Sequence, residues 1–385
     1  MKKIKCVVIS DDHYNGLGMV RSLGLLSQEI VLILLSEEKT FINLSKYVNE
    51  CIKISHTKEM LIKTIHHFIE TNIDCEIVFY PVNDFAAQVL DSIHESFTHN
   101  VICPNANGEL YKYSDKLFTK TIAREVGISV PYGELLELSL NVETELNLKK
   151  YPVIIKPVKS IEGAKSHIKT ANDKEELRVV INQYKSLGYK RALIEEYIGG
   201  NDSYMLEVMG SRSRTGIVEY AGIIQKHREF PIINGSTSFA TIIQEHEGID
   251  YSKLTQFLSK VGYIGLFDFE FKYLDGEAYF IECNFRNGAP SYAFTMNGYN
   301  LPGVWTENEL GISLGANNSK VNNIDFMIEQ NDIINMLKGH PNFYIWFKEY
   351  KKSCKVFYLS EDRKPTKAYY KQFFINAIKR IIRKP

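Results

Sequence analysis

The sequence predicts a protein of mixed α/β and α+β class, with an open parallel α/β domain at its N-terminal end. Short continuous apolar runs alternate with amphipathic segments over residues 1–110, as in a parallel sheet covered by helices. Longer alternating runs dominate the middle of the chain, where residues 265–286 have the pattern of a hydrophobic β-hairpin. The last stretch, 311–385, is expected to be a partly helical extension.

The composition is that of a folded, soluble protein. The 385 residues are 44% hydrophobic and 24% charged, and the formal net charge of zero gives no reason to expect nucleic acid as a partner. No apolar run approaches the roughly 20 residues of a membrane span, and the first apolar run is expected to be a strand, not a signal peptide. The six cysteines are scattered without a Cys-x-x-Cys pair. We therefore expect free thiols, no zinc site and a cytoplasmic location.

The N-terminal region is expected to hold four strands, at 4–9, 30–35, 76–80 and 100–103. Helices are expected around residues 19–23 and 57–70. Ligands of such sheets bind beyond the carboxyl ends of the strands, which makes Ser10–Gly18 and Pro81–Asp84 candidate site segments. The segment Asn15–Gly18 is not a dinucleotide fingerprint and is expected to be a plain turn. A dehydrogenase is therefore not expected.

Residues 111–200 place small and charged side chains at the ends of the expected helices and strands. Ser114 is expected to cap a helix that ends near Gly127. A strand at 153–155 ends in Lys156, and the loop behind it contains Ser160 and Gly163. Such a loop can cover phosphates through backbone N–H groups; a plain surface turn is the alternative. After a helix at 173–187, a strand at 191–196 leads into a segment that can offer backbone groups to adenine and a carboxylate to ribose: Glu195, Glu196, Tyr197, Ile198 and Asp202.

Strands are expected at 204–209 and 217–224, and a helix at 250–261. Lys226 and Arg228 follow the second of these strands. They would place two cations near a phosphate site. An ordinary basic strand end is the alternative.

The hairpin at 265–286 carries polar residues where apolar ones would be expected. Its first strand alternates phenylalanines with charged residues, and its second strand places Glu282, Asn284 and Arg286 on one face. Carboxylates on packed strands cost free energy unless a cation pairs with them. Glu270, Glu282 and Asn284 offer the hard oxygen ligands that suit Mg²⁺, which keeps waters and substrate phosphates as its other ligands. An amphipathic hairpin with a solvated acidic face is the alternative.

The length of the hairpin loop decides whether these ligands meet. A two-residue loop, Asp275-Gly276, would turn Glu270 and Glu282 to opposite faces. A three-residue loop, Asp275–Glu277, would place them directly opposite each other. If the hairpin holds a metal ion, its loop is therefore expected to have three residues.

The last twenty residues, 366–385, are expected to form a basic helix. Phe374, Ile378 and Ile381 would line one side, with lysines and arginines around them. Such a helix can lie on an anionic membrane surface, here the inner face of the membrane. Packing of the helix on the body of the protein is the alternative.

The order of these segments resembles the ATP-grasp superfamily over roughly residues 110–310. In addition, NGLGMVRSLG and SKYVNE in the N-terminal region are similar to segments of carboxylate–amine ligases, including the D-aspartate ligase-like group. The resemblance implies a two-lobed ATP-grasp domain at 111–310, with a lid subdomain at about 115–196, between an N-terminal domain at 1–110 and the extension at 311–385. It rests on Ser114-Asp115-Lys116, PVIIKP, Ser160–Lys165, LIEEYIGGND, Lys226, Arg228 and the polar face of the hairpin.

The resemblance also implies roles for the residues. Lys116 and Lys156 would contact the ATP phosphates, with Ser160 and Gly163 in the lid loop. Asp202 would take the ribose position, where Glu is usual, and Glu195, Glu196, Tyr197 and Ile198 would form the adenine hinge. The hairpin ligands would hold Mg²⁺, or Mn²⁺ in its place. Arg286 would stabilise an acyl phosphate or orient the carboxylate, with Lys226 and Arg228 as further catalytic cations. Phe285 replaces the proline usual before this arginine.

The implied activity joins a small-molecule carboxylate to an amine through an acyl phosphate and releases ADP and phosphate. An amino acid joined to another amino acid, a peptide or a cell-surface sugar acid would fit. Carboxylation or carbamoyl transfer with bicarbonate is a second class of function. A nucleotide-binding regulatory protein is a third, which the complete set of lysines and carboxylates disfavours. A homodimer and peripheral membrane contact through the last helix are compatible with these functions.

Overall fold

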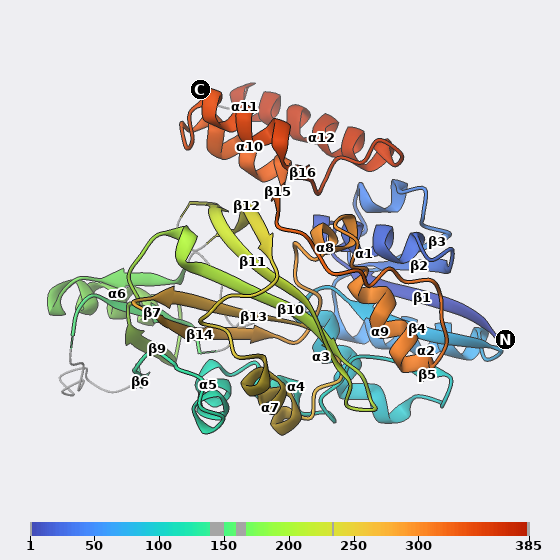
Figure 1. Ribbon diagram of the computed structural model, residues 1–385, viewed down its shortest axis with the longest axis horizontal. Helices are drawn as coiled ribbons and strands as arrows, with labels where there is room; N and C mark the ends of the chain where they lie inside the picture. The colour runs from blue at the N-terminus through green and yellow to red at the C-terminus, as the bar shows by residue number, and fades with distance from the viewer. Residues whose placement is uncertain (1, 139–149, 159–166, 233–234, 383–385) are drawn as a thin grey trace.

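The computed structural model describes residues 2–138, 150–158, 167–232 and 235–382, with side chains in the last helix described as far as Ile375. Three sheets follow one another along the chain, and a group of helices forms a layer beyond the third (Figure 1). The mixed α/β class and the two-lobed central region expected from the sequence are confirmed.

The first sheet has five parallel strands in the order β3-β2-β1-β4-β5. The four predicted strands are present, and the short β3 is a further strand that the sequence analysis missed. Helices cross between the strands, and the apolar side chains of β1, β2 and β4 are buried on both faces of the sheet. Its elements are β1 (Lys3–Ser10), α1 (Tyr14–Gly24), β2 (Glu29–Leu34), β3 (Glu50–Lys53), α2 (Lys58–Thr71), β4 (Cys75–Pro81), α3 (Asp84–Ile93) and β5 (Val101–Ile102).

The predicted turn at Asn15–Gly18 is wrong, because these residues lie in the first turns of α1. Both glycines sit where the helix is crowded by other parts of the chain. A Cβ on Gly16 would overlap the Ser10 side chain, and one on Gly18 would lie 2.8 Å from Cβ of Tyr292. The glycines therefore serve close packing of α1, not a change of chain direction.

The second sheet has four antiparallel strands in the order β6-β9-β7-β8. Asp115, not Ser114, caps α5, because its carboxylate accepts hydrogen bonds from the N–H groups of Leu117 and Phe118. Ser114 instead ends the short preceding helix. The elements of this part are α4 (Leu110–Tyr113), α5 (Lys116–Glu125), β6 (Gly133–Glu137), β7 (Val153–Lys156), β8 (Lys169–Ala171), α6 (Lys174–Ser186) and β9 (Arg191–Glu196).

The third sheet has seven strands in the order β14-β13-β10-β11-β12-β15-β16. One face of the hairpin packs on α7 through aromatic rings, with Phe257 at 5.3 Å from Phe269 and 5.7 Å from Phe280. That packing leaves the charged face of the hairpin turned the other way. The elements are β10 (Met205–Arg212), β11 (Val218–Phe230), β12 (Ser236–Ile243), α7 (Tyr251–Val261), β13 (Gly265–Leu274), β14 (Glu277–Asn284), β15 (Ile324–Met327) and β16 (Cys354–Lys355).

The predicted three-residue hairpin loop is wrong. Glu270 and Glu282 nevertheless lie opposite each other, as that loop was expected to place them. The loop is Asp275-Gly276, with φ of 52° and 83°, as a two-residue type I′ turn requires. From the turn to the pair Phe271 and Phe280, the two strands pair in regular register. The next pair is Glu270 and Glu282, so Ile281 is skipped. Ile281 is the extra residue of a β-bulge, which shifts the strand by one position and restores the common face.

The remaining helices connect the sheets and form the C-terminal layer. In the described part of α12, Tyr369 packs on Phe41 and Phe357 at ring distances of 5.5 and 4.9 Å. The predicted last helix is confirmed, and its first half packs on the body; the side chains of Ile378 and Ile381 lie outside the described residues. The helices are α8 (Tyr292–Met296), α9 (Leu301–Leu310), α10 (Glu329–Leu337), α11 (Phe343–Lys352) and α12 (Arg363–Ile382).

A search of the described residues for a helix long and apolar enough to cross a membrane finds none. All six cysteines are free thiols, as expected, and three of them are buried: Cys6, Cys103 and Cys283.

Candidate functional site

A cavity of about 500 Å³ lies between the second and third sheets. Nine of the residues expected at an ATP site line it, contributed by both sheets and by the start of α5. Ser160 and Gly163 lie outside the described residues. The nine are Lys116, Lys156, Glu195, Glu196, Tyr197, Ile198, Asp202, Glu270 and Glu282.

Both apolar and ionic side chains line the cavity. The apolar side chains are suited to a planar base, and the lysines to phosphate groups. Asp202 lies at the start of a short 3₁₀ helix (Asp202–Tyr204), where its carboxylate accepts a hydrogen bond from the N–H of Glu229 at 3.1 Å. The apolar side chains that line the cavity are Ile154, Ile168, Ile198, Met205, Ile232 and Ile281.

A buried ionic triad supports the lysine of β7. Glu195 pairs with Lys156, whose Nζ lies 2.5 Å from Oε2, and also with Lys120 of α5. Burial alone would raise the pKa of Glu195, but the two lysines lower it. Burial and the neighbouring Lys156 lower the pKa of Lys120 to about 7. Lys120 was missed in the sequence because it sits on the buried side of an ordinary amphipathic helix, and nothing local marks it.

Lys120 should make stability depend on pH. Between about pH 7 and pH 10 the unfolded chain holds a proton on Lys120 that the folded protein lacks, so stability should rise by up to roughly 1.4 kcal/mol per pH unit. Lys120→Met should remove this rise. Urea unfolding of both proteins across this range measures it, with Lys169→Met, exposed on β8, as the matched control. Equal pH slopes for wild type and Lys120→Met would contradict the assignment.

Three glutamates form a row across adjacent strands of the third sheet. Glu207 of β10 lies opposite Glu270 of β13, which lies opposite Glu282 of β14. Lys116 pairs with Glu282. On the other side, Lys226 is buried with Nζ 2.8 Å from Glu207 and 3.8 Å from Glu270. Burial opposes the charge on Lys226, but Glu207, Glu270 and Glu229 raise its pKa well above the usual value.

The donor set around this row fits a hard cation. Asn284 donates hydrogen bonds to Glu270 at 3.3 Å and to Asp268 at 3.4 Å, so the expected ligands lie together. Oε2 of Glu207 and Oδ1 of Asp268 are buried, and within the described residues neither accepts a hydrogen bond. Burial, Glu207 and Glu270 raise the pKa of Asp268 well above its usual range. Such a concentration of oxygen atoms is stabilised by a cation.

The described ranges contain no group of three or more His, Cys, Asp or Glu side chains that could hold a metal ion. Mg²⁺ commonly binds through one or two carboxylates together with substrate phosphates and waters. Glu270, Glu282 and Asn284 are a set of that kind.

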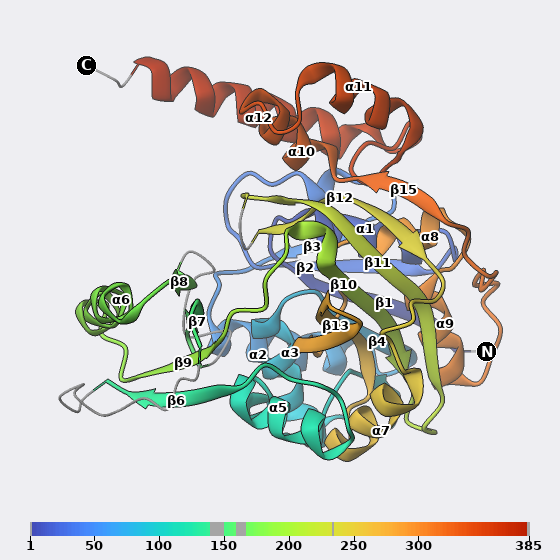
Figure 2. The same cartoon turned by 60° about the vertical axis from the view of Figure 1, so that its left-hand side comes forward.

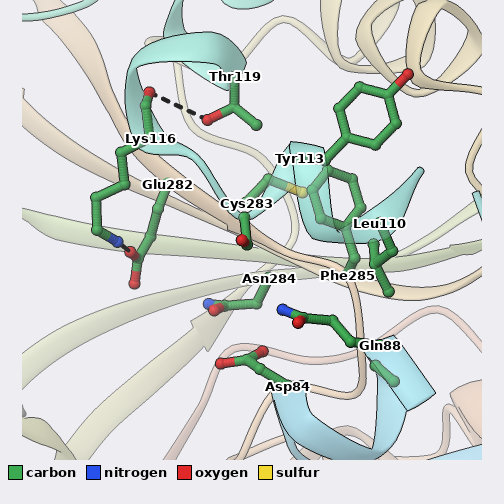
Figure 3. A pocket seen from close by; sticks show the side chains of 12 residues that line it. Asp84, Gln88, Leu110, Tyr113, Lys116, Thr119, Glu282, Cys283, Asn284 and Phe285 are labelled. Atoms are coloured by element: carbon green, nitrogen blue, oxygen red, sulfur yellow. Dashed lines mark hydrogen bonds and ion pairs between the residues drawn. The ribbon is translucent and has the colours of Figure 1, made fainter. Parts of the chain in front are cut away.

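Arg286 faces the N-terminal domain from the end of the hairpin. Its Nε donates to Asp84 at 2.9 Å and its Nη2 donates to Asn284 at 3.2 Å. A small recess beside the main cavity shares Lys116 and Glu282 with it and reaches Asp84 and Gln88 of α3 (Figure 3). The carboxyl end of β4 is thus brought to the site, as the position of Pro81–Asp84 suggested. Nothing in the sequence marked Asp84 as the partner of Arg286.

Two expected catalytic cations lie elsewhere. Lys226 is buried behind the glutamate row and does not line the cavity. Arg228 faces the C-terminal layer, where it pairs with Asp332 at 2.7 Å and Glu349 at 2.8 Å and lies over the Phe239 ring. The structure therefore does not bring Arg228 to the site. His227, its neighbour on the strand, lines the cavity instead.

Comparisons with known proteins find similar sequences and structures, although no family model matches the chain. The sequence is similar to a D-aspartate ligase of Enterococcus faecium (strain Aus0004), with 25% identity over 324 residues, covering 79% of this chain and 76% of that protein. The structure resembles N5-carboxyaminoimidazole synthetase from Staphylococcus aureus, with a TM-score of 0.66, 16% identity and coverage of 89% and 88%. It also resembles L-amino acid ligase from Bacillus licheniformis, with a TM-score of 0.60, 14% identity and coverage of 84% and 78%. The chain therefore has the fold of these two solved enzymes, as the ATP-grasp resemblance of the sequence led us to expect.

Proposed function

We propose that the protein is an ATP-dependent carboxylate–amine ligase that forms an amide through an acyl phosphate. One observation carries the proposal: a single cavity is lined by apolar side chains, by Lys116 and Lys156 and by the carboxylates of Glu270 and Glu282, and Arg286 follows the strand that carries Glu282. The similarity to a D-aspartate ligase and to an L-amino acid ligase supports the same chemistry. We further propose that at least one substrate is an amino acid.

Different residues would bind the base, the ribose, the phosphates and the metal ion. The apolar side chains of the cavity and the segment Glu195–Ile198 would hold adenine, and Asp202 would face the ribose. Lys116 and Lys156 would neutralise the phosphates, and Glu270, Glu282 and Asn284 would hold Mg²⁺, or Mn²⁺ through the same oxygen ligands. Bound Mg²⁺ would offset the charge that spreads over the transferred phosphoryl group.

Arg286 would orient the substrate carboxylate. The carboxylate oxygen would attack the γ-phosphorus and ADP would leave. The amine nitrogen would then attack the acyl carbon, phosphate would leave, and the nitrogen would give up its proton. The chain would supply position and charge rather than a covalent nucleophile.

The decisive experiment measures ADP release with Mg-ATP against a panel of amino acids, dipeptides, sugar acids and bicarbonate, with mass spectrometry of the products. We expect release that depends on an amino acid and a new amide mass. Release that depends on bicarbonate alone would instead support a carboxylase, a reaction class consistent with the structural similarity to a carboxyaminoimidazole synthetase. ATP binding without turnover across the panel would contradict a ligase of small amino-acid substrates.

We also propose that the domain boundaries lie near residues 110 and 310, that the protein forms a homodimer, and that it works at the inner face of the cytoplasmic membrane. Light scattering during size-exclusion chromatography tests the dimer, and a monomeric mass would contradict it.

A further inference from the structure

The helix α11 exposes large apolar side chains, none of which lines the ATP cavity. Phe343 is 62% exposed, Tyr344 79% and Phe347 41%. Trp346 is buried and joins Phe239 and Met327 in a small core, so it anchors the helix to the third sheet. Ile345 is exposed as well, at 44%. Single exposed apolar residues are ordinary, but four within five positions of one helix form a patch of the kind that binds a partner.

Three lysines lie on or next to the same side of the helix. At about 100° per residue, Lys351 falls on the arc that carries the three aromatic residues, and Lys348 and Lys352 extend this arc on one side. Trp346 and Glu349 lie on the opposite side of the helix. Phe343 stacks on Phe347 at 5.7 Å, and Nζ of Lys351 lies 4.4 Å from the centre of the Phe347 ring. We call this surface the α11 face: Phe343, Tyr344, Phe347, Lys348, Lys351 and Lys352.

The region around the α11 face is strongly basic. Residues 338–385 contain thirteen lysines and arginines against three acidic residues, in a chain whose formal net charge is zero. Two of those acids are engaged within the protein, because Glu349 pairs with Arg228 at 2.8 Å and Asp362 pairs with Arg21 at 3.0 Å. The positive charge of this end is therefore hardly offset locally, and it would attract an anionic surface.

The C-terminal layer lies at one end of the molecule, beyond β12 and β15 and away from α5 and α7 (Figures 1 and 2). A broad flat partner could therefore approach α11 without meeting the other two sheets. Because Glu349 and Trp346 fix α11 to the sheet that lines the ATP cavity, binding there would also fix how the cavity is oriented to that partner.

We propose that the α11 face binds the surface of an anionic lipid membrane. Aromatic rings favour the interface between headgroups and acyl chains, and lysines next to them are attracted by anionic headgroups. A second copy of this chain would bring two strongly positive faces together and is disfavoured by repulsion. The proposal goes beyond the ligase chemistry and does not depend on it.

The test is co-sedimentation of the full-length protein with phosphatidylcholine vesicles, with and without phosphatidylglycerol. We expect binding only when phosphatidylglycerol is present, weakened by added salt. The triple variant Phe343→Ser, Tyr344→Ser, Phe347→Ser should lower binding by about tenfold or more. A matched control replaces three exposed apolar residues elsewhere, Ile73, Val179 and Leu187, with serine and should bind like wild type. Thermal unfolding checks that both variants are folded.

Several outcomes would overturn the proposal. They are the absence of vesicle binding by the wild type, equal binding to neutral vesicles, or undiminished binding by the triple variant. Loss of binding in Phe374→Ser but not in the triple variant would assign the contact to α12. Binding to single-stranded RNA without binding to vesicles would assign the face to nucleic acid, and a dimer that the triple variant disrupts, again without vesicle binding, would assign it to self-association.

Discussion

Replacing Glu282 with glutamine should lower Mg-ATP turnover by a factor on the order of 10³. The substitution keeps the size of the side chain but removes the charge that pairs with Lys116 and that would bind the metal. Glu282 lies at the end of the glutamate row, opposite Glu270. Because the charge is needed most when the phosphoryl group is transferred, the loss should appear mainly in kcat. Steady-state ADP release, with whichever substrate supports wild-type turnover, measures it.

Glu277→Gln is the matched control for this experiment. Glu277 lies on the same strand and is exposed, beside the hairpin turn. Its substitution should leave turnover within about twofold of wild type, as is usual for surface changes away from a site. Wild-type turnover in Glu282→Gln would refute the metal assignment, even if the protein proved to be a ligase.

Replacing Arg21 with methionine should lower the free energy of unfolding by about 3–5 kcal/mol. Arg21 of α1 and Asp362 form a completely buried ion pair, with Nε 3.0 Å from Oδ2. The guanidinium also donates to the carbonyl oxygens of Phe357 and Asp362 at 2.8 and 3.1 Å. Methionine fills much of the volume but leaves the Asp362 carboxylate without its cation, which is costly in a buried position. Urea unfolding followed by circular dichroism measures the loss.

Two comparison variants test whether the loss of stability in Arg21→Met comes from the buried ion pair. Arg178→Met removes a surface arginine that pairs with Glu175 at 2.7 Å on α6, and it should change stability by no more than about 1 kcal/mol. The double variant Arg21→Met, Asp362→Asn should recover part of the loss, because no uncompensated charge remains. A loss in Arg21→Met as small as that in Arg178→Met would show that the buried pair does not hold the C-terminal layer to α1.

The sequence by itself determined the succession of elements and nine of the residues that line the site. Apolar runs are local signals, so they located four of the five strands of the first sheet and the hairpin to within a residue or two. The ordered motifs then identified Lys116, Lys156, Glu195–Ile198, Asp202, Glu270 and Glu282, all of which line one cavity. These residues stand at strand or helix ends, or on a face whose period of two shows in the sequence.

Only the tertiary structure decided how strands align and what buried side chains meet. The bulge at Ile281 could not be read from the sequence, because a regular strand and a bulged one have the same composition and differ only in pairing with a neighbour. Lys120 was missed, and the pairing of Asp84 with Arg286 was not foreseen, because Lys120 and Asp84 lie 75 and 202 residues from their partners, Glu195 and Arg286. Arg228 was misplaced for the same reason. Its side of the sheet is set by irregular pairing with β12 and by the distant carboxylates of Asp332 and Glu349, and contacts across such separations exist only once the chain has folded.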